Sequence, residues 1–187
     1  MKPRELAIGL MLAVLFSLGW WIRELTTPEA LPRPVAEASP DAFAETLRVH
    51  TYDSTGRLEQ TLITPYMEHY ESTDTSELNQ PVLWRFFSDS PPWRMEAEKA
   101  LANNKEARIF LPGKVVMDRN ADRQNPAYHI VTRDLTLETN NARATTDQPV
   151  LIESGQNRIT AIGMEGWWRA PIKLNLLNRV RGLYVFD

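Results

Sequence analysis

Apolar and polar side chains alternate over long stretches of this chain, and this period of two limits the fold more than any other feature. Leu47 and Val49 alternate with polar neighbours, and the same pattern recurs over residues 107–117 and 128–137. Successive side chains of a β-strand point to opposite faces, so the alternation predicts strands with one buried face. The sequence therefore predicts an all-β domain of antiparallel strands over residues 43–187.

The β region also repeats. Gln80-Pro-Val-Leu83 recurs as Gln148-Pro-Val-Leu151, and each copy is preceded by a strand pair, over residues 57–70 and 128–146. The unit is about four strands long and occurs twice, after an additional first strand over Ala44–Tyr52. Units of this kind bury their apolar faces only by stacking, so the repeat predicts an open-ended jellyroll or solenoid.

The first and last strands of such a stack have unpaired edges. The last predicted strand, Arg179–Phe186, places Val180, Tyr184 and Phe186 on one face, and nothing after it is expected to cover its edge. Open edges are normally protected because they promote association. The pattern therefore indicates that a partner adds a strand here.

Residues 6–22 form an apolar run without a charged side chain. As a helix it spans about 25 Å at about 1.5 Å per residue, slightly less than a hydrocarbon core of about 30 Å. Lys2 and Arg4 precede the run, which keeps residues 1–5 in the cytoplasm, and Trp20 and Trp21 lie where an interfacial aromatic belt is expected. The run is therefore predicted to be a transmembrane helix.

The alternative is a cleaved signal peptide with Leu6–Leu18 as its core and Ser17-Leu18-Gly19 as its cleavage site. Two tryptophans at the cut and a continuing apolar run favour the uncleaved anchor. Both interpretations place the β domain across the membrane. The segment 23–42 is rich in proline, which favours an extended stalk between helix and domain.

Composition excludes several classes of function. The chain has no cysteine, which rules out disulfides and thiolate chemistry, and its net charge of −3 gives no reason to expect nucleic-acid binding. The spacing of His50, His69 and His129 fits no metal motif, and nucleotide and serine-hydrolase motifs are absent. No cofactor is expected. A membrane-tethered periplasmic hydrolase of cell-wall glycan stays as the alternative function, and it needs two carboxylates that converge across a cleft.

Short motifs succeed one another along nearly the whole chain. They are Tyr52…Gly56-Arg57-Leu58, Tyr66…Tyr70, Gln80-Pro81-Val82, Trp93…Ala97…Ala100, Leu111-x-Gly113-x-Val115, Thr132…Leu135, Gly163-Met164-x-Gly166 and Val180-Arg181…Tyr184. In order and spacing they resemble the LptC family, the single-pass component of the lipopolysaccharide export system in Gram-negative inner membranes. The stretch Trp167–Pro171 has no counterpart in that pattern.

The resemblance implies a V-shaped, open-ended β-jellyroll whose apolar groove takes the acyl chains of lipopolysaccharide. It also implies a non-catalytic protein of the inner membrane with a cytoplasmic N-terminus and a periplasmic C-terminal domain. The anchor and the N-terminal edge would assemble with the ATP-driven transporter LptB2FG, and the C-terminal edge would pair with the periplasmic protein LptA.

Strand parity and the resemblance together predict the site residues. The predicted groove consists of Leu47, Val49, Leu58, Leu62, Leu78, Val82, Trp84, Phe86, Met95, Ile109, Leu111, Val115, Met117, Tyr128, Ile130 and Leu135. The predicted edge for the partner protein consists of Val180, Gly182, Tyr184 and Phe186. The alternative for each groove residue is an ordinary core position, since a jellyroll is able to fill with its own side chains.

Overall fold

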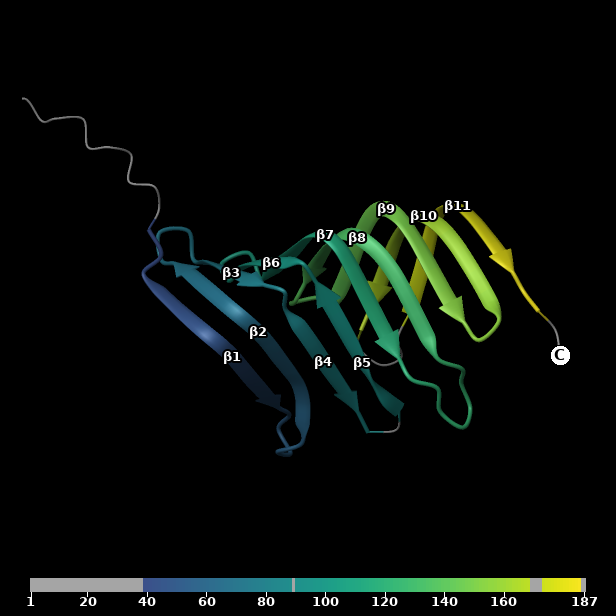
Figure 1. Ribbon diagram of the computed structural model, residues 1–187, viewed down its shortest axis with the longest axis horizontal. Coiled ribbons are helices and arrows are strands. Elements are labelled where there is room, and N and C mark those ends of the chain that lie inside the picture. The colour runs from purple at the N-terminus through teal and green to yellow at the C-terminus, as the bar shows by residue number, and fades with distance from the viewer. Residues whose placement is uncertain (1–38, 89, 169–172, 186–187) are drawn as a thin grey trace, which may run out of the picture. The chain divides into compact units, whose positions relative to one another are not determined.

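The computed structural model describes residues 39–88, 90–168 and 173–185. Within them the chain is all-β, with eleven antiparallel strands in one sheet (Figure 1). This confirms the prediction of an all-β domain and is consistent with a β-jellyroll. No helix among these residues is long and apolar enough to cross a membrane. The predicted helix 6–22 and nearly all of the predicted stalk lie outside the described residues.

The strands are β1 (Ala42–Tyr52), β2 (Leu58–Tyr70), β3 (Thr75–Asn79), β4 (Val82–Phe87), β5 (Ser90–Ala97), β6 (Lys99–Asn103), β7 (Arg108–Arg119), β8 (Tyr128–Glu138), β9 (Arg143–Ser154), β10 (Asn157–Trp167) and β11 (Lys173–Leu183). Most neighbours in the sheet are also neighbours in the sequence. β1 pairs with β2 at one end, and β11 pairs with β10 at the other (Figure 1).

The pairing register divides the sheet into two limbs. β2 pairs with β3 through Tyr66–Tyr70 and with β4 through Gln60–Ile63. β7 pairs with β6 through Arg108–Phe110 and with β5 through Val115–Arg119. Limb A therefore contains β3 and β6, limb B contains β4 and β5, and the longer strands give one half to each limb.

A line of bends separates the limbs. Several residues along it have left-handed backbone conformations, and at each of them except Thr46 the pairing register shifts or the strand breaks. They are Thr46, Gln80, Gly113, Asp134, Gly163 and Arg179. A residue inserted at a bulge bends the strand and can move the side chains after it to the other face.

The sequence repeat corresponds to this architecture. The first Gln-Pro pair lies at the break between β3 and β4, and the second lies at the bend of the continuous strand β9. Strands β2 to β7 therefore correspond to β8 to β11. The pair β3 and β4 matches the single strand β9, and the pair β5 and β6 matches the single strand β10. The leading strand β1 stands outside the repeat, as predicted.

Buried side chains of both limbs belong to one hydrophobic cluster. Leu135 and Met164 come from limb A, and Val115, Val150 and Ile152 come from limb B. The faces that carry these residues pack against each other and are called the inner faces below. The opposite faces of the two limbs are called the outer faces.

One local expectation needs correction. The last strand begins and ends earlier than predicted, at Lys173 and Leu183. Tyr184 therefore lies beyond the strand, and Phe186 lies outside the described residues.

Candidate functional site: an apolar inner face between two limbs

The inner face of limb B carries a continuous apolar row that crosses the strands. Cross-strand partners share a face, so the register assigns the row directly. Its members are Val49, Leu62, Leu83, Met95, Met117, Ile130, Ile152 and Ile159. A second row lies nearer the bend and includes Leu47, Ala97, Val115, Thr132, Val150 and Ala161.

Limb A presents a matching surface. Its inner face carries Met67, Leu78, Ala100, Ile109, Leu111, Leu135, Leu137, Ala144, Met164 and Leu176. The two limbs together therefore line a continuous apolar interior that runs from β1 to β11.

Packing within this interior is uneven along the sheet. At the centre, Leu135 and Val115 are 0% exposed and Met164 is 2% exposed. At the two ends, Val49 on β1 is 40% exposed and Leu174 on β11 is 41% exposed, although both lie on the inner face. The centre is filled by the protein's own side chains, whereas apolar surface is accessible at both ends.

Most of the predicted groove residues lie together on the inner faces. They are Leu47, Val49, Leu58, Leu62, Leu78, Met95, Ile109, Leu111, Val115, Met117, Tyr128, Ile130 and Leu135. Whether any of them contacts lipid stays a prediction.

The shared face predicted for β4 is wrong. Val82 pairs with Glu96, and Trp84 pairs with Arg94, whose guanidinium carbon lies 5.6 Å from the centre of the indole ring. Both therefore face outward. Phe86 lies in the bulge where the register with β5 shifts. The cause is the left-handed conformation of Gln80 before Pro81, which changes the alternation by one residue, so that Leu83 faces inward instead.

Sequence reasoning missed the inward residues of the second repeat copy. Val150 is 2% exposed, Ile152 5% and Met164 2%. The repeat contained a usable signal for β10, which corresponds to β5 and β6, but not for β9, because Val150 takes the position of Val82, which faces outward. Leu83 had no such signal, because only the bend determines its face.

Each end of the sheet has an open edge. Within the described residues β1 pairs only with β2, and β11 pairs only with β10. Val180 and Gly182 lie in β11, and the ring of Tyr184 folds so closely over Gly182 that a Cβ there would come within 2.7 Å of it. The strand is anchored beyond its end by the backbone N–H of Val185, which donates to Asn157 Oδ1 at 3.0 Å.

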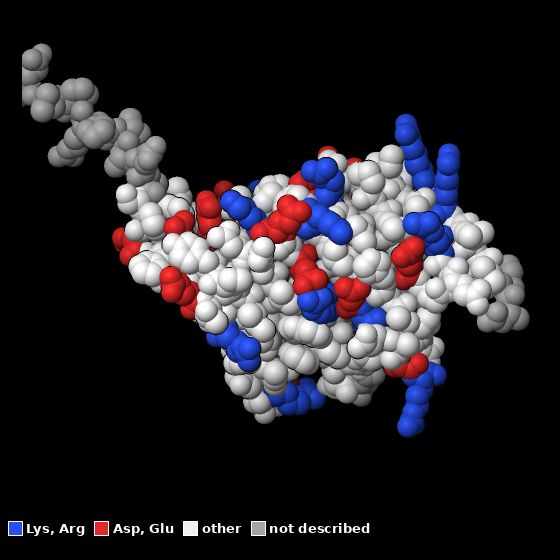
Figure 2. Space-filling model, viewed as in Figure 1, with Lys and Arg blue, Asp and Glu red and all other residues white. Residues whose placement is uncertain are grey.

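The outer faces carry mixed charge. Figure 2 shows Lys and Arg interspersed with Asp and Glu over the visible face, in keeping with the net charge of −3. Two open hollows of about 630 and 610 Å³ lie along the bend, and most of their lining residues belong to the outer faces. Neither hollow lies in the apolar interior.

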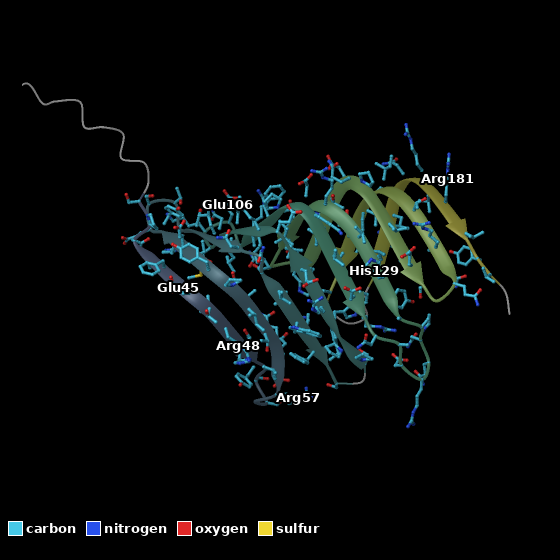
Figure 3. All side chains as sticks on the ribbon, viewed as in Figure 1. Glu45, Arg48, Arg57, Glu106, His129 and Arg181 are labelled. Atoms are coloured by element: carbon cyan, nitrogen blue, oxygen red, sulfur yellow. The ribbon has the colours of Figure 1, made fainter. Side chains whose placement is uncertain are left out.

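The histidines make local hydrogen bonds. His129 Nδ1 lies 2.6 Å from Asp118 Oδ1 on the outer face of limb B (Figure 3). His50 bonds to Thr61, and His69 bonds to Ser76. In the part of the chain that the structure describes, no group of three His, Cys, Asp or Glu residues is placed to hold a metal ion.

Hydrogen bonds perturb a few titrating groups. Tyr66 and Tyr70 both donate to Glu68 at 2.9 Å, which raises the pKa of each hydroxyl because ionisation would lose the bond and oppose a carboxylate. Asp53 accepts bonds from Thr55 and Arg57 in the loop between β1 and β2, which lowers the pKa of its carboxyl. Hydrogen bonds from the backbone N–H groups of Gln124 and Gly113 likewise lower the pKa of Asp122 and Asp134.

Comparison with known protein families matches residues 7–185 to LptC, described as Lipopolysaccharide-assembly, LptC-related. The chain belongs to the LptC family. A comparison with curated proteins gave no match.

Membership in the LptC family means that this protein takes part in lipopolysaccharide transport as a membrane-associated component. The family is a transport family and is not known as an enzyme family.

Proposed function

We propose that this chain is a non-catalytic, lipopolysaccharide-binding subunit of the export machinery. It receives lipopolysaccharide from the inner-membrane transporter LptB2FG and passes it, acyl chains inward, to the periplasmic protein LptA. The observation that carries the proposal is the apolar interior that runs across a sheet with an open edge at each end, in a member of the LptC family.

The energetics support a lipid as cargo. Burying an acyl chain contributes about 0.8 kcal/mol per methylene, so apolar contact alone gives sufficient affinity. The half-buried inner residues of β2, β4 and β5 offer such contact, and Leu62 and Met95 are examples. Movement along the interior requires an external energy source, because the sequence contains no nucleotide-binding motif.

The two open edges support the proposed order of partners. Strand addition continues a sheet, so a partner that joins β1 or β11 extends the same interior. We assign the β1 edge, with the N-terminal anchor, to LptB2FG and the β11 edge to LptA. The anchor holds the protein in the inner membrane as a single-pass segment, with the β domain in the periplasm.

Site-specific photo-crosslinking in cells tests the cargo. Leu83 and Trp84 are adjacent on β4 and face opposite sides, so they form a matched pair. A crosslinker at Leu83 should capture lipopolysaccharide, and one at Trp84 should not. Equal capture at both positions, or capture at neither Leu83 nor Leu62, would contradict the proposal.

A second experiment tests the edge. Val180→Pro should reduce co-purification of LptA with the full-length chain, because proline disrupts strand pairing. The control is Lys105→Pro, at an exposed position of the β6–β7 loop. Unchanged LptA recovery with Val180→Pro would refute the edge assignment. Hydrolysis of cell-wall glycan by the purified chain would favour the alternative function, a membrane-tethered periplasmic hydrolase.

A further inference from the structure

The inner face of limb B is apolar near the bend and carries arginine and aromatic side chains farther from it. The two rows nearer the bend are mainly apolar, but the row at the far rim includes Arg85, Trp93, Arg119 and Tyr128, between Gln60 on β2 and Ser154 on β9. These four residues are successive cross-strand partners on β4, β5, β7 and β8. The rim row therefore alternates cation and aromatic ring on the same face as the apolar rows.

The aromatic rings hold the two guanidinium groups by their faces. The Arg119 guanidinium carbon lies 5.0 Å from the ring centre of Tyr128 and 6.0 Å from that of Trp93. The Arg85 guanidinium carbon lies 5.8 Å from the ring centre of Phe87. Stacking of this kind uses the π face of guanidinium, whereas its N–H groups point along the edge and can donate to pairs of carboxylate or phosphate oxygens.

Both guanidinium groups retain an unused donor. Arg85 Nε and Arg119 Nε are buried and have no hydrogen-bond partner. The Arg119 side chain is only 10% exposed, and its nearest carboxylate, Asp122, is 3.6 Å away. Arg85 bonds to Glu59 at 2.8 Å and to Gln60 at 3.4 Å, and Arg119 also donates to the carbonyl of Pro126 at 3.2 Å. A buried donor without a partner is unusual and calls for an acceptor.

We propose that Arg85 and Arg119 form an anion subsite at the rim of the inner face, where they bind the phosphate of a lipid whose chains lie on the apolar rows. This inference rests on the proposed function and adds a headgroup position to it. The two arginines are two strands apart, which is about 10 Å at a strand spacing of about 4.8 Å, and they lie on either side of Trp93. Arginine provides the planar donors that phosphate prefers.

Binding assays with the full-length chain in detergent test the subsite. The probes are diphosphoryl lipid A and its dephosphorylated form. The unmodified chain should bind the phosphorylated lipid at least about tenfold more tightly, the effect expected for one charge-assisted hydrogen bond. The double variant Arg85→Gln/Arg119→Gln should remove this difference and leave the affinity for the dephosphorylated lipid unchanged.

A matched control uses outward-facing arginines of the same limb. Arg94→Gln/Arg133→Gln removes two cations from the outer face of β5 and β8 and should preserve the preference for phosphate. Because Arg119 also holds the β7–β8 loop through Pro126, Arg85→Gln alone provides a second variant that leaves this loop contact intact.

The outcomes separate this inference from the proposed function. If the unmodified chain binds both lipids equally, or if the double variant weakens both equally, the subsite is wrong and lipid binding stands. If neither lipid binds, the proposed function fails together with the subsite. Displacement of the lipid by inorganic phosphate at equimolar concentration would show that free phosphate is the ligand and would overturn the assignment to a headgroup.

Discussion

The uneven packing of the interior makes a quantitative prediction from two leucines. Leu135 is 0% exposed at the centre of the cluster, whereas Leu174 is 41% exposed on the inner face of β11. Leu135→Ala removes a fully packed side chain and leaves a cavity, which costs about 3–5 kcal/mol. Leu174→Ala removes less buried area and leaves no enclosed cavity, so it should cost about 1 kcal/mol.

Denaturant unfolding of the full-length chain, monitored by tryptophan fluorescence, measures both costs. The chain contains 6 tryptophans, which provide the signal. In thermal unfolding, the Leu135 variant should melt roughly 6–20 °C lower, since 1 kcal/mol corresponds to about 2–4 °C for a domain of this size.

Equal costs for the two variants, within about 0.5 kcal/mol, would refute the reasoning. They would mean that the interior is packed to the same degree from centre to end. The apolar surface accessible at the open ends would then no longer support lipid access there.

Three further perturbations test local features. Gly163 and Gly56 both have φ near +80°, so an alanine at either costs about 1–2 kcal/mol. In denaturant unfolding Gly163→Ala should cost more than Gly56→Ala, because its Cβ would lie 3.1 Å from Leu177, whereas nothing lies within 4 Å at Gly56. Equal costs would contradict the contact with Leu177. Glu68→Gln should lower the raised pKa of the two tyrosine hydroxyls that bond to it, and an unchanged alkaline absorbance titration would argue against these bonds. Because the pKa of Asp53 is lowered, its carboxylate stabilises the folded state above pH 3.8, and this stabilisation is lost as the pH falls further. An NMR titration of this carboxyl with a midpoint at or above 3.8 would disprove the loop hydrogen bonds.

The sequence by itself determined the fold class, the repeat and most inward positions. Strict alternation identified strands because a pleated backbone has a period of two. The paired Gln-Pro segments revealed two four-strand units, and the ordered motifs identified the LptC family. These features are local or depend only on spacing, so they can be recognised without tertiary contacts.

Only the tertiary structure decided which side chains face inward on each side of the bend. A single left-handed residue at the bend changes the parity of the residues after it, and alternation alone cannot locate that residue. This is why Val82 and Trp84 face outward and Leu83 faces inward. The rim row also depends on the tertiary structure, because cross-strand register between β4, β5 and β7 places Arg85 and Arg119 on one face, on either side of Trp93.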